Sequence, residues 1–515
     1  MSKFLMSLMV MGVFTFGLVK MLHLQGNQIG LFFFFTLIVV WFFSGFNREV
    51  RNNREYEKSP NSSGSYPNFS NQTAGLEWTR KKHLLSDKKD SVYIDKFTYS
   101  WETLKRFNLL HRLVFSSKTK NMYKKPLVFT RGSLVIGSMG SGKTEFIKSL
   151  LEQKFFNRTV IHDIKGDFTE YCYDRRDIIL NPFDKRGMIW NIFEESKRYP
   201  KIADSFFQSL LGGILGSSEQ NKNFFTSSAK ERFVKIFMEV QVQELSNKEK
   251  WNLFIKKINI YFQEVEELNQ KSEKDIVSTM KLLVEYLEYM NYLIQNGTKT
   301  FTISKFLRSN KKLFLLNNPT YSEFLTPYFS AFIDSFTKIF MAEMSETKDN
   351  LTLFLLDEYL SLLPLLSEDS KTILHTLIRN IGGCMMPAIQ YLPEDKKLKQ
   401  QLLNSAENIY LFQTSDTSTA KEIKDIFGEV VYSSENRSES HNRDSGYQNS
   451  YSTAREYLLT DEILKEIGND YSHITFTQSN QQLYKGYTKL LKRENKNKPF
   501  VMGSYIEFIE DKYKN

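Results

Sequence analysis

The hydrophobic positions of the chain fall into three patterns that succeed one another along its length. Residues 4–19 and 29–46 form two long apolar runs without a charged side chain. Residues 126–199 and 309–480 instead contain short apolar runs, typical of buried strands, separated by segments of helical spacing. Residues 200–308 show apolar positions at helical spacing alone. Because strands that alternate with helices form parallel sheets, the pattern predicts an α/β domain with a parallel-dominated sheet and an inserted all-α domain.

The two apolar runs predict a transmembrane hairpin over residues 1–48, with helices at about 4–22 and 29–46. Each run approaches the ~20 residues that cross a hydrocarbon layer. A cleaved signal peptide is the alternative for the first run, but a small-x-small cleavage site is lacking and a second span follows directly. Basic side chains after the second span keep that end cytoplasmic: Arg48, Arg51, Arg54 and Lys58. We therefore expect a multi-pass membrane protein whose catalytic part lies in the cytoplasm.

The segment between the hairpin and the α/β domain has a different composition. Residues 59–75 carry no charge and are rich in Ser, Asn, Gly and Pro, which is typical of a flexible tether. Residues 76–125 predict a small, strand-containing lead-in. The expected order is hairpin (1–48), tether and lead-in (49–125), first part of the α/β domain (126–199), all-α insertion (200–308), second part of the α/β domain (309–480) and basic C-terminal segment (481–515).

Charge and cysteine content narrow the function classes only slightly. The chain has 515 residues and a formal charge of +10, which permits an anionic partner such as nucleic acid but equally fits a solvated lysine-rich surface. Its two cysteines, Cys172 and Cys384, are far apart and outside metal-ligand spacing. This usage excludes a disulfide framework and argues against a zinc site.

The clearest chemical motif lies at residues 137–144, after an apolar run at 133–136 and before a helical pattern that begins near Glu145. It is G-x-x-x-x-G-K-T, in which glycines let backbone N–H groups surround a polyphosphate. Lys143 would contact the β- and γ-phosphates, and Thr144 would hold Mg²⁺. We expect ATP to be bound by Gly137, Ser138, Met139, Gly140, Ser141, Gly142, Lys143 and Thr144.

An apolar run at 351–356 is followed by two acidic residues. They could supply the two further groups that hydrolysis needs, a Mg²⁺ ligand and a general base. Asp357 would hold the Mg²⁺ shell, and Glu358 would polarise the attacking water. Such a strand followed by acids is also common at ordinary protein surfaces. The phosphate loop upstream favours the functional interpretation.

Two further polar residues are candidates for the same site. Gln390 ends an apolar run at 384–389, so in a parallel sheet it would face the γ-phosphate. Arg379 ends a predicted helix at 374–378. An arginine there either complements the helix dipole or acts as an arginine finger on the nucleotide of a neighbouring subunit.

Five sequence stretches together resemble a known family. They are GSMGSGKT (137–144), HDIKGD (162–167), NPFDKRGMIWNIFEE (181–195), LFLLDE (353–358) and IRNIGGCMMPAIQ (378–390). With the hairpin and the helical insertion, they make the chain similar to the type IV coupling proteins of bacterial conjugation and type IV secretion. This TraD/TraG-like group belongs to the FtsK/HerA class of RecA-like, DNA-translocating ATPases.

The resemblance implies a bacterial inner-membrane homohexamer that uses ATP and Mg²⁺ to pump DNA, without strong sequence preference, into a secretion channel. Its implied partners are a relaxase or other secretion substrate and the channel components. It also implies that Arg379 acts on a neighbouring subunit, that Gln390 senses nucleotide, and that residues 200–308 stand at the ring entrance.

Other interpretations remain open at this stage. The chain could be an FtsK- or HerA-like DNA motor unrelated to secretion, or a non-pumping, nucleotide-dependent receptor for protein cargo. Residues 433–453 are polar and predict a loop. The lysine-rich stretch around 485–498 could contact nucleic acid or be a solvated charge run.

Overall fold

A computed structural model describes most of the chain after residue 125. The described residues are 72–74, 92–97, 120–124, 126–215, 220–268, 271–344, 350–439, 447–457, 459, 461, 464, 467, 472–478, 482–487 and 494–514. The predicted membrane hairpin (1–48) and most of the tether lie outside them. None of the described helices combines the length and the apolar composition that crossing a membrane requires. The described residues form two units. The larger lies within residues 76–427 and 459–515, and the smaller consists of residues 72–74, 428–439 and 447–457.

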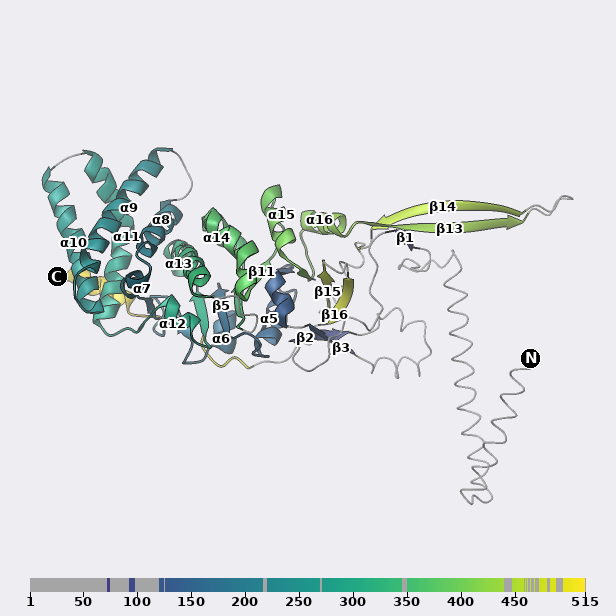
Figure 1. Cartoon of the computed structure of the whole chain (residues 1–515), viewed down its shortest axis with the longest axis horizontal. Coiled ribbons are helices and arrows are strands. Elements are labelled where there is room, and N and C mark those ends of the chain that lie inside the picture. Colours follow the sequence, from purple (N-terminus) through teal and green to yellow (C-terminus); the bar gives the residue numbers. More distant parts are fainter. Residues whose placement is uncertain are drawn as a thin grey trace, which may run out of the picture. The chain divides into compact units, whose positions relative to one another are not determined.

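The larger unit is built on one sheet of eleven described strands (Figure 1). Seven neighbouring strands are parallel, and four antiparallel strands extend the sheet beyond β12. In spatial order the strands are β3 (Lys120–Lys124), β2 (Val92–Phe97), β16 (Gln482–Tyr487), β15 (Ser472–Thr477), β12 (Asn408–Leu411), β4 (Ser133–Ile136), β11 (Gly383–Ile389), β10 (Thr352–Leu356), β5 (Arg158–Asp163), β9 (Lys312–Leu316) and β6 (Ile178–Ile179). The predicted α/β class with a mostly parallel sheet is therefore confirmed.

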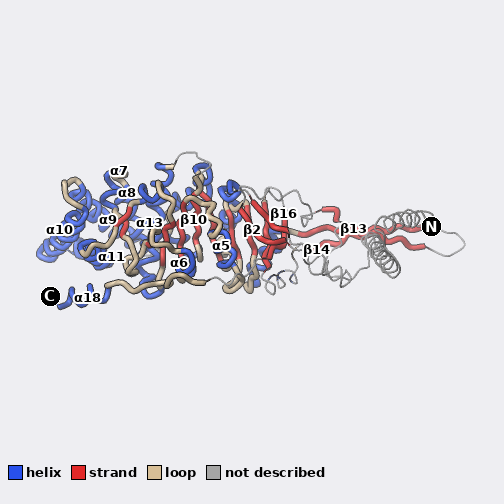
Figure 2. Tube along the Cα trace, turned by 90° about the horizontal axis from the view of Figure 1, so that it is seen from below, coloured by secondary structure: helices blue, strands red, loops and turns tan. Residues whose placement is uncertain are grey.

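The central parallel strands are buried along their whole length, which explains their continuous apolar sequences. Helices lie on the faces of this sheet, as Figure 2 shows. The helical elements of this domain are α5 (Lys143–Leu151), α6 (Asp167–Cys172), α12 (Ile303–Leu307), α13 (Ser322–Glu343), α14 (Glu368–Thr372), α15 (Lys396–Ser405) and α16 (Thr417–Phe427), with 3₁₀ turns η3 (Pro126–Arg131), η4 (Pro319–Tyr321), η5 (Tyr359–Ser361) and η6 (Leu363–Leu365). Because helices cover both faces of the parallel sheet, a ligand is expected to bind at the carboxyl ends of its strands.

The insertion is a helical bundle, visible beside the α/β domain in Figure 1. Its helices are α7 (Ile192–Arg198), α8 (Ile202–Leu215), α9 (Gln220–Gln241), α10 (Asn247–Leu268) and α11 (Lys271–Gln295). A two-stranded parallel ladder, β7 (Ile189–Trp190) with β8 (Thr300–Phe301), joins its two ends. Helix α8 also contacts α13, where the Ser209 hydroxyl donates to buried Asp334 at 2.6 Å. The bundle is thus connected to the α/β domain at its two ends and through helix α8.

Residues 494–514 form a C-terminal strap that runs from the α/β domain to the insertion. Backbone bonds tie it to the sequence NPFDKR at 181–186, among them Gly503 N to Phe183 O at 2.8 Å. The Asp184 side chain accepts from Val501 N at 2.9 Å. The strap ends in α18 (Tyr505–Lys514), whose Tyr505 hydroxyl bonds Glu285 of α11. The NPFDKR stretch therefore forms the surface to which the strap binds.

The smaller unit is an antiparallel sheet of three described strands, β1 (Gln72–Ala74), β13 (Glu429–Glu439) and β14 (Tyr447–Tyr457). The loop predicted over residues 433–453 is wrong for most of its length. Strands β13 and β14 pair in register from Glu429 opposite Tyr457 to Glu439 opposite Tyr447. Pairing between backbones needs no apolar alternation, so hydrophobic periodicity gave no sign of it.

Candidate functional site

The phosphate loop leaves the carboxyl end of β4 and enters α5 at Lys143, two residues before the predicted start. Gly140 and Gly142 have φ angles of 76° and 100°, a left-handed conformation that disfavours side chains. A Cβ on Gly137 would lie 2.5 Å from the Cβ of Phe412, so only glycine fits there. Steric crowding and backbone angles thus explain all three glycines of the motif.

The loop is also pinned to the end of the neighbouring strand β12. Ser138 N donates to Gln413 O at 2.7 Å. Ser415 N in turn donates to the Ser138 hydroxyl at 2.7 Å. These bonds fix the loop from outside, so its curvature is set before any ligand arrives.

The ammonium of Lys143 folds back onto the loop. It bonds the carbonyl oxygens of Gly137 and Ser138, the latter at 2.9 Å. Burial lowers the pKa of Lys143, against the opposing effect of Asp357 and Glu358. A partly buried cation held only by two neutral carbonyls is well suited to a phosphate partner.

An acidic edge faces the loop, at the ends of β5 and β10. The two strands pair directly, and His162 Nδ1 bonds the carbonyl of Asp357 at 2.8 Å. Burial, with nearby Asp163 and Glu358, raises the pKa of Asp357 to about 7. Burial raises the pKa of Asp163 to about 6, although Thr169 donates two bonds to it. Carboxyls this close together and this buried favour an added cation.

Glu358 lies at the centre of a small polar cluster with Gln390 and Lys165. Its φ angle is 46°, a strained value for a residue with a side chain and one typical of functional sites. Its Oε1 accepts a bond from Gln390 Nε2 at 3.1 Å and lies 3.6 Å from Lys165 Nζ. The sequence predicted a place beside the γ-phosphate for Gln390 and a water-polarising role for Glu358, and the structure adds a direct contact between the two side chains.

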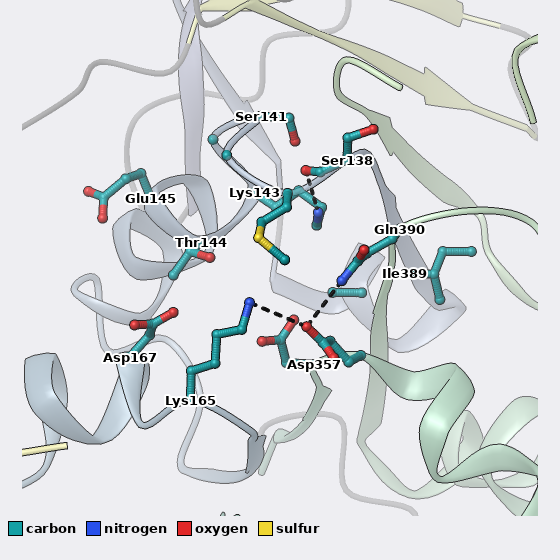
Figure 3. Close-up of a pocket in the computed structure, with 15 residues that line it drawn as sticks. Ser138, Ser141, Lys143, Thr144, Glu145, Lys165, Asp167, Asp357, Ile389 and Gln390 are labelled. Carbon is teal, nitrogen blue, oxygen red and sulfur yellow. Dashed lines mark hydrogen bonds and ion pairs between the residues drawn. The ribbon is translucent and has the colours of Figure 1, made fainter. Parts of the chain in front are cut away.

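Loop and acidic edge enclose a pocket of about 300 Å³, which we call the phosphate-loop pocket (Figure 3). It is lined by Ser138, Met139, Gly140, Ser141, Gly142, Lys143, Thr144, Glu145, Lys165, Asp167, Asp357, Glu358, Ala388, Ile389 and Gln390. Of the predicted ligand-binding residues, Gly137 contributes only its carbonyl to Lys143 and is not in the lining. The prediction missed Glu145, Lys165 and Asp167, although the motif HDIKGD at a strand end could have indicated the last two.

Arg379 is the predicted site residue that stands apart. It is exposed and does not line the pocket of its own chain. The predicted helix before it is irregular: α14 continues into a π-helical turn (η7, Ile373–Leu377) and a 3₁₀ turn (η8, Ile378–Ile381). Such π turns occur often at functional sites. The side chain of Arg379 is therefore accessible to groups outside its own pocket.

The chemistry of the lining fits a magnesium–nucleotide complex. Thr144 and Asp357 offer hydroxyl and carboxylate oxygens, the ligand types that Mg²⁺ prefers, on opposite sides of the pocket. Lys143 and the glycine-rich backbone offer donors to phosphate. These residues could therefore hold both parts of the complex.

Comparison with known families decides the family of the chain. A family described as the type IV secretion-system coupling protein DNA-binding domain matches residues 125–476, which is 352 of 515 residues. The chain belongs to the type IV coupling protein family. The predicted family is thus confirmed, and the match spans both parts of the α/β domain and the insertion between them.

Solved structures of the plasmid coupling protein TrwB share this fold. TrwB with a non-hydrolysable ATP analogue is 18% identical, with a TM-score of 0.55, covering 80% of this chain and 100% of that one. Unbound TrwB lacking its N-terminal 70 residues is 19% identical, with a TM-score of 0.54, covering 74% and 90%. TrwB with ADP and Mg²⁺ is 19% identical, with a TM-score of 0.52 and the same coverage. A search of curated protein sequences found no match to the chain.

Proposed function

We propose that this coupling protein is an inner-membrane ATPase that recruits DNA, or a relaxase–DNA complex, and pumps it into a type IV secretion channel. The observation that carries the proposal is the phosphate-loop pocket, where a phosphate loop faces two carboxylates and an amide within a chain of the coupling protein family. That TrwB was solved with ADP and Mg²⁺ and with an ATP analogue supports the choice of ligand.

Binding would rest on the loop. The Lys143 ammonium would exchange its two loop carbonyls for phosphate oxygens, gaining charge-assisted bonds. The backbone N–H groups that follow Gly137 would surround the same phosphates. Because the bonds from Ser138 to residues 413–415 already hold the loop, little ordering would accompany binding.

Hydrolysis would rest on the acidic edge. Thr144 and Asp357 would hold Mg²⁺, which when bound neutralises charge on the phosphate oxygens. Glu358 would accept a proton from the attacking water, as a general base positioned by its αL backbone. Gln390, bonded to Glu358 at 3.1 Å, would respond to the presence of a γ-phosphate.

Arg379 would complete the site from a neighbouring subunit of a homohexamer, since it is exposed and outside its own pocket. Mixing Arg379→Ala with Lys143→Ala subunits, each inactive alone, should restore part of the ATPase activity. Some interfaces then pair an intact loop with an intact arginine. No recovery in rings shown to be mixed would assign Arg379 to a local structural role.

The DNA motor is tested with the full chain in detergent, by measuring ATP turnover with and without DNA beside a salt titration of DNA binding. Contacts with phosphates alone predict little sequence preference and a log–log salt slope of about −0.9 for each duplex phosphate neutralised. DNA should raise turnover, and Lys143→Ala should abolish it. Turnover indifferent to DNA in assembled rings would favour a nucleotide-dependent receptor for protein cargo.

A further inference from the structure

Lys165 lies in the phosphate-loop pocket without a role in the scheme above. It follows β5 and reaches across to Glu358, two residues after the end of β10. Its ammonium therefore lies near the acidic edge and opposite the phosphate loop (Figure 3). It lies near enough to Lys143 to lower the pKa of that lysine by charge repulsion. The pocket therefore contains two ammonium groups, one on the loop side and one on the acidic side.

The pairing of Lys165 with Glu358 is weak enough to be exchanged. Its Nζ–Oε1 distance is 3.6 Å, and the two side chains are 47% and 31% exposed. Solvent-exposed ion pairs of this kind contribute little to stability. The same Oε1 atom already accepts the shorter bond from Gln390. Lys165 can thus leave Glu358 without stranding a buried charge.

The charges that line the pocket favour a change of partner for the Lys165 ammonium when a phosphate chain binds. Four carboxyl groups line the pocket, and only two ammonium groups offset them: Glu145, Asp167, Asp357 and Glu358 against Lys143 and Lys165. A phosphate chain adds further negative charge beside Glu358. The terminal phosphate attracts an ammonium more strongly than a single exposed carboxylate does, because it carries more charge and more acceptor oxygens.

The backbone under Lys165 is fixed, so only its side chain is free to change partner. Asp163 accepts two bonds of 2.7 Å from Thr169, which close the turn around Lys165. Gly166, with a φ angle of 79°, lies against the strap so closely that a Cβ there would meet Pro499 at 2.6 Å. The turn therefore aims Lys165 into the pocket from a rigid base.

We propose that Lys165 is a further substrate-binding residue that leaves Glu358 for the terminal phosphate of a nucleoside triphosphate, freeing Glu358 to act on water. This inference rests on the proposed ATPase function. It makes Lys165 a discriminator between nucleoside triphosphate and diphosphate, because a diphosphate lacks the group that Lys165 would contact.

The test compares the affinities of the full chain for ADP and for a non-hydrolysable ATP analogue, using fluorescently labelled nucleotides. Lys165→Met keeps the length of the side chain and removes its charge. Loss of one charge-assisted bond should weaken binding of the analogue by about tenfold to a hundredfold. ADP affinity should change by less than about threefold, and Lys165→Arg should retain most of the discrimination. Equal effects on both nucleotides, or no effect on either, would overturn the proposal.

Two controls separate this proposal from simpler explanations. Lys257→Met removes a comparable exposed ion pair, with Glu239 at 2.7 Å, in the insertion and should leave both affinities unchanged. In a Glu358→Gln background, Lys165→Met should still weaken binding of the analogue, since the lost contact is with phosphate. If the effect disappears there, Lys165 acts only by holding Glu358. If the wild-type chain binds neither nucleotide, the proposed function itself fails.

Discussion

The phosphate-loop pocket and the core of the helical insertion bury very different side chains. The pocket encloses Asp357 beside further carboxyls and holds Glu358 at a strained φ of 46°. The insertion core stacks aromatic rings, such as Phe193 on Phe237 with centroids 4.4 Å apart, around a void of only about 10 Å³. Charge and strain destabilise the empty pocket, whereas close packing stabilises the bundle. The well-packed insertion therefore contributes folding free energy that offsets the cost of the charged, strained pocket. That cost remains until a ligand binds.

The largest effect should come from changing the chemistry of the pocket. Glu358→Gln should bind ATP and reduce turnover by about 10²- to 10⁴-fold, because only water activation is lost. Lys143→Ala should lose nucleotide binding itself, because the phosphates lose their main counter-ion. Single-turnover kinetics and equilibrium binding distinguish the two variants. Near-normal hydrolysis by Glu358→Gln would remove this carboxylate from the mechanism.

A core substitution in the insertion should instead reduce stability, whereas a substitution of an exposed pocket residue should not. Phe237 is fully buried, so Phe237→Ala should lower the free energy of unfolding by about 3–5 kcal/mol. In the pocket, Met139 is 70% exposed, and Met139→Ala should cost less than about 0.5 kcal/mol. Denaturant titration of both variants measures the difference. A similar cost for the two changes would contradict the contrast between the regions.

A smaller effect should appear as a pH dependence of stability in the nucleotide-free protein. The pKa of Asp357 is raised to about 7 in the folded state, so its contribution to stability is fully present below its unfolded pKa near 4. That contribution is lost as pH rises through 7. Asp357→Asn should therefore equal the wild type near pH 4 and exceed it at pH 8 by roughly 1–4 kcal/mol. Thermal unfolding at both pH values tests this, and a less stable variant at pH 8 would refute it.

The sequence predicted the loop side of the pocket better than the acidic side. Residues 137–144 are consecutive, and local rules on glycine and helix starts determine their shape. The acidic side joins residues 165, 358 and 390, which meet only because β10 lies between β5 and β11. Strand order depends on long-range packing, so the contact between Lys165 and Glu358 could not be deduced from spacing.

The secondary structure likewise contains elements that local sequence patterns predicted and elements that they missed. The strand at 133–136 was predicted with correct bounds, since its apolar run is short and sharply ended. The polar strands β13 and β14 were missed because periodicity detects strands by their buried face. The π turn before Arg379 was also missed, because the helical spacing of apolar residues does not reveal one extra residue in a turn.

The C-terminal strap has a consequence for how the protein is made. Gly503 bonds Phe183 across 320 positions of the chain (503 − 183). At the usual pace of synthesis this interval lasts roughly 15–65 s, during which the NPFDKR segment lacks its hydrogen-bond partners in the strap. In the folded chain the ring of Phe183 stacks on Tyr321, with centroids 4.0 Å apart, and its contact with Tyr505 can form only once the strap has been made. The contacts of the strap, which link the α/β domain to the insertion, are therefore the last of these contacts to form during translation.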